Sequence, residues 1–354
     1  DGGIVISASH NPAEYNGIKF FDRGGFKLPD EIEDEIEEYL VSEDADSRPT
    51  GAAVGHAEVV ADAVERYVAH AVSTVPGGLA GLKIAIDCGH GAATHTTPAA
   101  FEALGAEVTA INCDWDGMDI NAGCGSTHLD VVAGLVRDGV SDLGIAHDGD
   151  ADRVLAVDET GAEVDGDRIM AVCAVDLAER GALPGSAVVA TVMSNLGFER
   201  ALKDRGITVV KTRVGDRYVL DQMRASGATF GGEQSGHVIF LDHATTGDGL
   251  VTALQLASVV KRSGRRLSEL AQVMSHYPQV LVNVPVADRG LLSGSAAIAD
   301  AVRDAERELG DDGRVLVRPS GTEPLVRVMV EAAEEELARA VADRLVTVVR
   351  AELG

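Results

Sequence analysis

The chain has 354 residues, of which 57 are acidic and 30 basic, and its formal net charge is −27. At roughly 100–200 residues per domain this length predicts about two to four domains, and a hydrophobic content of 45% excludes a disordered or collagen-like chain. The acidic excess argues against nucleic acid and anionic membrane surfaces as partners, whereas a small phosphate needs only a few well-placed arginines.

The first half of the chain alternates predicted strands and helices. In segment 1–62 we expect strands at 3–7 and 17–21, a helix at 30–40 and an exposed loop or linker at 42–55. In segment 63–160 we expect strands at 83–88, 107–112, 143–147 and 154–158, with helices at 97–104 and 129–136. This alternation predicts an α/β layer with a mostly parallel sheet.

The second half continues the alternation and then changes. In segment 161–277 we expect helices at 169–180, 198–205, 215–225 and 251–263, with strands at 187–191 and 208–212. In segment 278–354 we expect strands at 279–286, 314–318 and 326–331, with helices at 294–309 and 335–352. The last segment is typical of an α+β domain with antiparallel strands, so we expect three related α/β units with mixed sheets and a different fourth one.

The sequence SASHNP (residues 7–12) directly follows the first predicted strand. A turn of small residues there presents a hydroxyl at the carboxyl edge of a sheet, where α/β proteins bind ligands. His10 and Asn11 add hydrogen-bonding groups, and Pro12 stiffens the turn. Taken alone, the hexapeptide fits a plain Ser/Asn turn better than a functional site.

The sequence DGDADR (residues 148–153) places Asp148, Asp150 and Asp152 on one side of an extended chain. Three carboxylates converge naturally on a hard divalent cation, and three protein oxygens leave room for a phosphate ligand, which suits Mg²⁺. An EF-hand is excluded because Arg153 stands where that loop needs glycine and because the flanks are strands. A solvated acidic turn is the alternative, but the repulsion of three carboxylates on a β hairpin favours a cation.

The sequence GGEQSGH (residues 231–237) has glycines on both sides of Glu233 and Ser235, so its backbone can approach a ligand closely. Both side chains can point the same way and bind adjacent sugar hydroxyls. A glycine-rich turn between strands explains the pattern equally well.

The sequence RPSGTEP (residues 318–324), with Arg327 beyond it, combines arginines, two hydroxyls and free backbone N–H groups at a glycine. Such a set forms an anion nest, and we favour phosphate binding over a structural turn.

The four cysteines have no C-x-x-C spacing, so the usual patterns of zinc and dithiol redox sites are absent, which fits a reducing compartment. They are Cys88, Cys113, Cys124 and Cys173.

These four loops, in this order, resemble those of the α-D-phosphohexomutase superfamily, and the resemblance covers the whole chain. GEQSGH (232–237), NAGCGST (121–127) and VGDRYV (214–219) look like its bacterial phosphoglucosamine mutase subgroup. The resemblance implies four domains that each contribute one loop: 1–62, 63–160, 161–277 and 278–354. Members of the family carry further strands and helices before the serine loop, so we expect this chain to begin inside an incomplete first domain.

The resemblance also implies residue roles. Ser9 would be the phosphoserine, and Asp148, Asp150 and Asp152 would hold Mg²⁺ together with an oxygen of its phosphate. Lys19, in NGIKFF (16–21), matches a lysine proposed as general acid/base, and partial desolvation would lower its pKa. The remaining matches are His10 and Arg153 beside the phosphoserine; Glu233, Ser235 and His237 at the sugar; and Arg318, Ser320, Gly321, Thr322 and Arg327 at the phosphate that is not transferred.

The implied activity is the interconversion of glucosamine 6-phosphate and glucosamine 1-phosphate through a bisphosphorylated sugar, in the cytoplasm, with a homodimer as the assembly. Two alternatives stay open: a phosphomannomutase or phosphoglucomutase with the same machinery, and a non-catalytic fragment that binds sugar phosphates. A Ca²⁺-binding structural module rests only on the 148–159 spacing.

Overall fold

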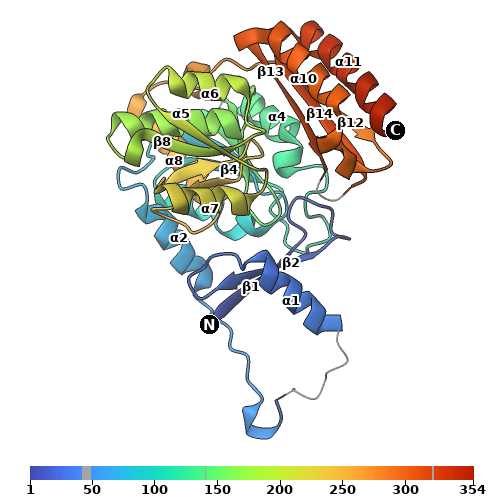
Figure 1. Ribbon diagram of the computed structural model, residues 1–354. Coiled ribbons are helices and arrows are strands. Elements are labelled where there is room, and N and C mark those ends of the chain that lie inside the picture. Colours follow the sequence, from blue (N-terminus) through green and yellow to red (C-terminus); the bar gives the residue numbers. More distant parts are fainter. Residues whose placement is uncertain (42–48, 140, 321–322) are drawn as a thin grey trace. The chain divides into compact units, whose positions relative to one another are not determined.

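The computed structural model describes residues 1–41, 49–139, 141–320 and 323–354 (Figure 1). Its contacts divide the chain into two compact units. One consists of Asp1–Met193 with Arg205–Val273, and the other of Ser194–Asp204 with Met274–Gly354. Part of the loop expected at 42–55 lies outside the described residues.

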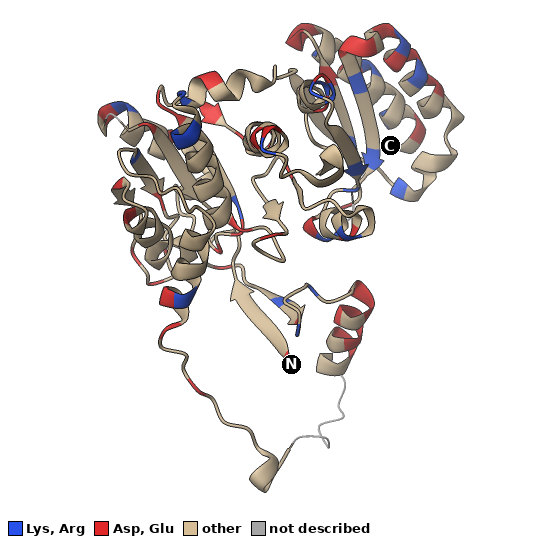
Figure 2. Cartoon of the chain, turned by 90° about the vertical axis from the view of Figure 1, so that its left-hand side faces the viewer, with Lys and Arg blue, Asp and Glu red and all other residues tan. Residues whose placement is uncertain are grey.

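The first unit begins with an antiparallel hairpin of β1 (Gly2–Ser7) and β2 (Gly17–Asp22), in which Val5 pairs with Lys19. The helix α1 (Asp30–Val41) follows and has no buried residue; acidic residues recur along its length (Figure 2). The hairpin places the serine loop (residues 7–12) at the end of β1 and Lys19 in the neighbouring strand.

A five-stranded sheet follows in the order β4-β3-β5-β6-β7. Its strands are β3 (Lys83–Asp87), β4 (Glu107–Ile111), β5 (Leu143–His147), β6 (Val154–Asp158) and β7 (Glu163–Val164). The helices of this region are α2 (Ala63–Ser73), α3 (Thr97–Ala103) and α4 (Leu129–Gly139). The strand β3 is parallel to β4 and β5, whereas β5 and β6 form an antiparallel hairpin, so the sheet is mixed rather than mostly parallel.

The helix α4 packs closely on this sheet because Gly144 in β5 has no side chain. A Cβ there would lie 2.6 Å from Val157, 2.8 Å from Val136 and 2.9 Å from Val132. Val132 and Val136 are four residues apart and therefore share one helix face, which is buried against the strands. This packing fixes the hairpin whose turn carries the three aspartates.

A second sheet of the first unit has the order β11-β10-β8-β9. Its strands are β8 (Ala187–Thr191), β9 (Thr208–Thr212), β10 (Phe230–Gly232) and β11 (Val238–Phe240), and its helices are α5 (Gly166–Glu179), α7 (Asp216–Ser226), α8 (Gly249–Ser263) and α9 (Leu267–Leu270). The strands β9, β8 and β10 are parallel, and β11 turns back antiparallel to β10. The turn between β10 and β11 is the glycine loop (residues 232–237).

The second unit is a three-stranded antiparallel sheet in the order β12-β14-β13. Its strands are β12 (Gln279–Pro285), β13 (Gly313–Pro319) and β14 (Leu325–Ala332), and its helices are α6 (Leu196–Lys203), α10 (Ala296–Leu309) and α11 (Glu335–Leu353). Buried valines of the strands and the apolar face of α11 form its core. The short 3₁₀ helices in the described residues of both units are η2 (Gly51–Ala53), η3 (Ala92–His95), η4 (Gly125–Thr127), η5 (Pro184–Ser186), η6 (Ala271–Val273), η7 (Arg289–Gly294) and η8 (Gly310–Asp312).

The expected fold class, α/β units with a final α+β domain, is confirmed. The strands predicted at 143–147, 154–158, 187–191 and 208–212 match the structure to the residue. The elements α2, β7, β10, β11 and α9 were not predicted. Among the described residues, no helix combines the length and the apolar character that crossing a membrane requires.

The second unit contains a buried carboxylate whose loss should be costly. Glu331 is fully buried; it accepts hydrogen bonds from Arg314 at 2.6 Å and from the backbone N–H of Leu196 at 2.9 Å. Glu331→Ala leaves these donors without their acceptor, so we expect the free energy of unfolding to fall by about 3 kcal/mol in a urea titration. Asp304→Ala, at an exposed ion pair on α10, is the matched control and should cost about 0.5 kcal/mol or less. Equal losses in the two variants would contradict this reading of Glu331.

Candidate functional site

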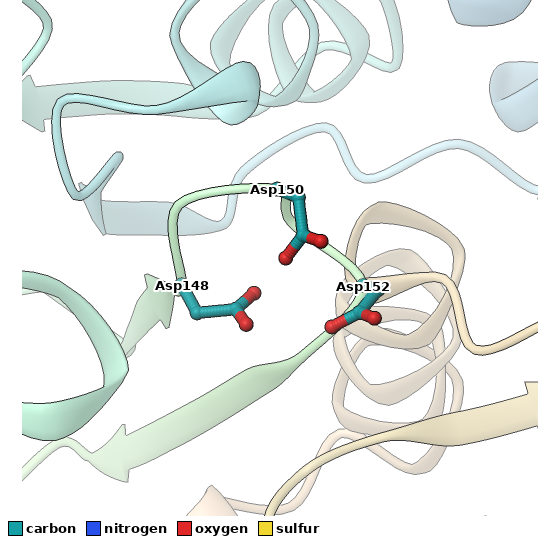
Figure 3. Close-up of side chains that lie close together, drawn as sticks. All are labelled: Asp148, Asp150 and Asp152. Carbon is teal, nitrogen blue, oxygen red and sulfur yellow. The ribbon is translucent and has the colours of Figure 1, made fainter. Parts of the chain in front are cut away.

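The turn between β5 and β6, here named the aspartate loop (residues 148–153), gathers three carboxylates. Figure 3 shows Asp148, Asp150 and Asp152 in this turn, and one ligand atom from each lies within 4.8 Å of the others. The backbone N–H of Gly249 at the start of α8 donates to the carbonyl of Ala151 at 2.9 Å, and Ala151 adopts a left-handed φ of 57°. The expected placement on a β hairpin is confirmed. Glu159 does not belong to this cluster; its carboxylate accepts a hydrogen bond from the backbone N–H of Ser268.

The carboxylates of the aspartate loop have unsatisfied oxygens. Asp148 Oδ2, Asp150 Oδ1 and Asp152 Oδ1 are buried and have no hydrogen-bond partner in the described part of the chain. Burial and the charges of Asp152 and Asp150 raise the pKa of Asp148 to about 8. Unsatisfied anionic oxygens of this kind are costly unless a cation completes them, so the three residues fit a divalent metal ion.

Lys19 lies against the aspartate loop. Its Nζ donates to Asp150 Oδ2 at 2.6 Å and to Asp152 Oδ2 at 3.0 Å. Burial lowers the pKa of an ammonium, but the two carboxylates outweigh it and hold the pKa of Lys19 above its ordinary value. The expectation of a lowered pKa was therefore wrong, because the sequence did not reveal these partners.

The serine loop docks on the aspartate loop through its backbone. The carbonyl of Ser9 accepts hydrogen bonds from the N–H of Gly149 at 3.0 Å and from Asn121 Nδ2 at 2.7 Å. A Cβ at Gly149 would lie 2.5 Å from this carbonyl oxygen, so only glycine permits the approach. Ser9 itself has a left-handed φ of 53° and is half-buried.

Two charged or titratable side chains, His10 and Arg153, lie near the serine and aspartate loops. His10 Nδ1 lies 3.5 Å from Ser9 Oγ, and burial together with the charge of Arg153 lowers the pKa of His10. Arg153 Nε is buried, has no hydrogen-bond partner among the described residues and lies 3.9 Å from Asp152 Oδ1. An imidazole and an unsatisfied guanidinium group suit a site that receives a phosphoryl group.

Three polar side chains of the glycine loop differ in their exposure and in their hydrogen-bond partners. Glu233 accepts a hydrogen bond from the N–H of Gly215 at 3.0 Å, and Ser235 is exposed. His237 is only 2% exposed; its Nε2 accepts from the N–H of Gly247 at 3.1 Å, and its Nδ1 lies 3.6 Å from Asp152 Oδ2. Glu233 and Ser235 can therefore meet a ligand, whereas the His237 ring serves the aspartate loop.

A cavity of about 210 Å³ lies where β1, β2, the aspartate loop and α7 meet. Its charged lining consists of Lys19, Lys27, Asp150, Asp152, Asp216 and Asp248. Lys27 Nζ pairs with Asp216 Oδ2 at 3.2 Å. Burial raises the pKa of Asp216, but Lys27 and His237 outweigh burial, so the pKa is lowered overall. The cavity thus combines an apolar wall with charged side chains, among them the proposed metal ligands Asp150 and Asp152.

The second unit holds the arginine pair of the RPSGTEP motif. Arg318 in β13 lies directly opposite Arg327 in β14, and Nε of each is buried without a hydrogen-bond partner in the described part of the chain. Burial and the charge of Arg327 lower the pKa of Arg318. Like charges opposed across a sheet destabilise it, so the pair fits an anion. Ser320 is buried, and Gly321 and Thr322 lie outside the described residues.

Several residues of the site were not assigned a role from sequence. Asn121, the first residue of the NAGCGST motif, contacts the serine loop, and Arg289 donates to the carbonyls of Ser320 and Glu323 in the second unit. Nothing in a single sequence marks these partners, because each contact joins segments far apart in the chain.

Comparisons with known proteins agree with this geometry. The four domain models of the phosphoglucomutase/phosphomannomutase family match in order: domain I at residues 1–47, II at 65–161, III at 165–277 and the C-terminal domain at 281–348. The chain is 57% identical to the phosphoglucosamine mutase of Streptomyces coelicolor and 56% identical to that of Thermobifida fusca. Both matches cover the full length of this chain; they cover 79% of the Streptomyces protein and 78% of the Thermobifida protein.

Solved structures are also similar. A phosphoglucomutase/phosphomannomutase family protein from Burkholderia thailandensis superposes with a TM-score of 0.81 at 25% identity, covering 99% of this chain and 76% of that one. The N-acetylphosphoglucosamine mutase of Aspergillus fumigatus, solved with GlcNAc-6P and magnesium, has a TM-score of 0.77 at 21% identity. The match covers 100% of this chain and 89% of the fungal one, and it shows the shared fold.

Proposed function

This chain belongs to the phosphoglucomutase/phosphomannomutase family, and we propose that it acts as a phosphoglucosamine mutase that interconverts glucosamine 6-phosphate and glucosamine 1-phosphate. The observation that carries the proposal is the docking of the serine loop on the aspartate loop, where Gly149 N–H holds the Ser9 carbonyl at 3.0 Å. A nucleophile fixed beside three unsatisfied carboxylates suits phosphoryl transfer. Identity of 57% to a phosphoglucosamine mutase supports the sugar.

We propose that Asp148, Asp150 and Asp152 hold Mg²⁺ together with an oxygen of a phosphate on Ser9. The three unsatisfied oxygens and the oxygen-only donor set support this choice. When bound, such an ion offsets the negative charge that collects on the transferred phosphoryl group. The ring of His237, held by Gly247, would keep the Asp152 carboxylate in place rather than bind the sugar.

The proposed reaction has two transfers. In the first, the bond between phosphorus and Ser9 Oγ breaks as the free hydroxyl of the sugar phosphate bonds to phosphorus, which gives a sugar bisphosphate. This intermediate reorients in the site so that its other phosphoryl group faces Ser9. That group then passes to Ser9 Oγ, which leaves the isomeric monophosphate. His10 and Arg153 would line the phosphoserine.

Lys19 is the proposed proton carrier. Its Nζ donates to Asp150 Oδ2 at 2.6 Å and to Asp152 Oδ2 at 3.0 Å, and it would begin each transfer as the ammonium form. It would give that proton to the departing oxygen and take one from the attacking hydroxyl, so that no net proton is gained or lost in the exchange.

The remaining contacts divide between sugar and phosphate. Glu233 and Ser235 would bind sugar hydroxyls, while Arg318, Ser320 and Arg327, with Gly321 and Thr322, would hold the phosphate that is not being transferred. The opposed arginines support the second assignment, because a dianion between them relieves their repulsion.

We also propose the four loop-bearing domains 1–62, 63–160, 161–277 and 278–354, and the bisphosphate as activator. A homodimer and a cytoplasmic location stay predictions from the resemblance.

A coupled assay with several sugar phosphates tests the proposal. We expect the kcat/KM for glucosamine 6-phosphate to exceed those for mannose 6-phosphate and glucose 6-phosphate by about tenfold or more, since an amino group can be recognised by a paired polar contact. The reverse preference would favour the phosphomannomutase or phosphoglucomutase alternative. No turnover with any sugar, together with no phosphate on Ser9, would favour a binding fragment and contradict the proposal.

A further inference from the structure

The side chain of Asn121 connects the serine loop to the sheet that carries the aspartate loop. Its Nδ2 donates to the carbonyl of Ser9 at 2.7 Å and to the carbonyl of Asn11 at 2.8 Å. Two carbonyl acceptors use both hydrogens of one amide nitrogen, which fixes the orientation of the side chain. Asn121 is also buried and therefore shielded from competing water.

The backbone around Asn121 is held in advance of these contacts. The N–H of Asn121 donates to the carbonyl of Gly89 at 3.0 Å, and the nearby Gly125 N–H donates to the buried Asp87 Oδ2 at 2.9 Å. Asp87 Oδ1 in turn accepts from Gly89 at 2.9 Å. The left-handed φ of Asn121, 58°, is thus fixed by a network that does not involve the serine loop.

We infer that Asn121 is a positioning residue that sets the place of Ser9 relative to the aspartate loop. Ser9 is in a left-handed conformation at the tip of a turn, and its carbonyl receives one donor from Gly149 and one from Asn121. Without Asn121 the Asn11 carbonyl loses its hydrogen bond from Nδ2, and the Ser9 carbonyl keeps the bond from the Gly149 N–H at 3.0 Å. Because phosphoryl transfer needs the attacking and leaving oxygens in line, a loosened Ser9 slows transfer more than it weakens binding of the sugar. The inference rests on the proposed role of Ser9.

The variant Asn121→Gly tests this inference without a folding penalty from the backbone, because glycine adopts a positive φ freely. We expect its kcat to fall by about 10- to 100-fold, with KM for the sugar phosphate changed by less than about threefold. Single-turnover transfer from phosphorylated Ser9 to the sugar should slow by the same factor as kcat. Asn121→Asp should lose more activity than Asn121→Gly, since a carboxylate oxygen would face the two carbonyl oxygens.

Asn112 provides the matched control. It also has a left-handed φ, 52°, and its Nδ2 also donates a hydrogen bond, to Asp87 Oδ1 at 3.0 Å, but within the described residues it makes no hydrogen bond to the serine loop. We expect Asn112→Gly to keep kcat within about threefold of the parent protein. Equal losses of kcat in the two glycine variants, or an unchanged kcat in Asn121→Gly, would overturn the inference.

A second measurement separates this inference from the proposed function. Hydrogen–deuterium exchange of residues 8–12 should be faster in Asn121→Gly than in Asn112→Gly, whatever the catalytic activity. A parent protein without mutase turnover would refute the proposed function, whereas unchanged exchange in Asn121→Gly would refute the docking role of Asn121.

Discussion

Replacing Ser9 with alanine should lower kcat of the mutase reaction by roughly 10⁴-fold or more, which is the scale seen when a covalent nucleophile is removed. The Oγ of Ser9 is the atom that would carry the phosphoryl group between the two transfers. The serine loop contains one other hydroxyl, that of Ser7. The Ser7 hydroxyl is occupied as the acceptor of the Ser9 N–H at 2.9 Å. A coupled assay measures the loss, and mass spectrometry of the intact protein measures the bound phosphate.

The variant Ser7→Ala is the comparison for this prediction. It removes a hydroxyl two residues away that supports the loop but does not carry phosphate, so we expect a loss of about tenfold or less and retention of phosphate on Ser9. Substantial turnover by Ser9→Ala, or a phosphate mapped to another residue in the parent protein, would remove Ser9 from the role of nucleophile.

The strands and the acidic triad could be predicted because their signals are local. The strand β5 is a short, fully buried run bounded by polar residues, and its predicted limits match the structure. Asp148, Asp150 and Asp152 share one side of a turn through their spacing alone. By contrast, β10 and β11 have only three residues each, too few to show a pattern against the glycines around them.

The contacts that decide the chemistry of the site are long-range, and the sequence does not encode them in any local pattern. Lys19 reaches Asp150 across 131 positions, and Asn121 reaches Ser9 across 112. The sequence suggested a desolvated lysine with a lowered pKa, but the two carboxylate partners reverse the direction of the shift. Burial of a titratable group can be guessed from its neighbours in sequence, whereas the sign of its pKa shift requires its neighbours in space.

Asp148→Asn should have opposite effects with and without metal. Asp148 is fully buried, and its pKa is raised to about 8 by burial and by the neighbouring carboxylates. The unfolded carboxyl titrates near 4, so in the metal-free protein the contribution of Asp148 to stability is full below about pH 4 and is lost as the pH rises from there through about 8. The neutral amide avoids this cost and still accepts the hydrogen bond that Arg153 N–H gives to Oδ1. We therefore expect metal-free Asp148→Asn to be more stable at pH 7 by roughly 1–3 kcal/mol.

Addition of Mg²⁺ should reverse this order. A bound ion at about 100 times its dissociation constant raises the free energy of unfolding by about 2.7 kcal/mol. The parent protein should show this gain and Asp148→Asn little of it, because one of the three oxygen ligands has lost its charge. Urea titrations at several pH values, with Mg²⁺ or a chelator, measure both effects, and the advantage of the metal-free variant should shrink as the pH falls toward 4.

Glu159→Gln is the control: Glu159 lies outside the triad, so its variant should keep the Mg²⁺ gain. Equal stabilisation of Asp148→Asn and the parent by Mg²⁺ would place the ion elsewhere, and loss of the gain in Glu159→Gln would revive the EF-hand-like alternative.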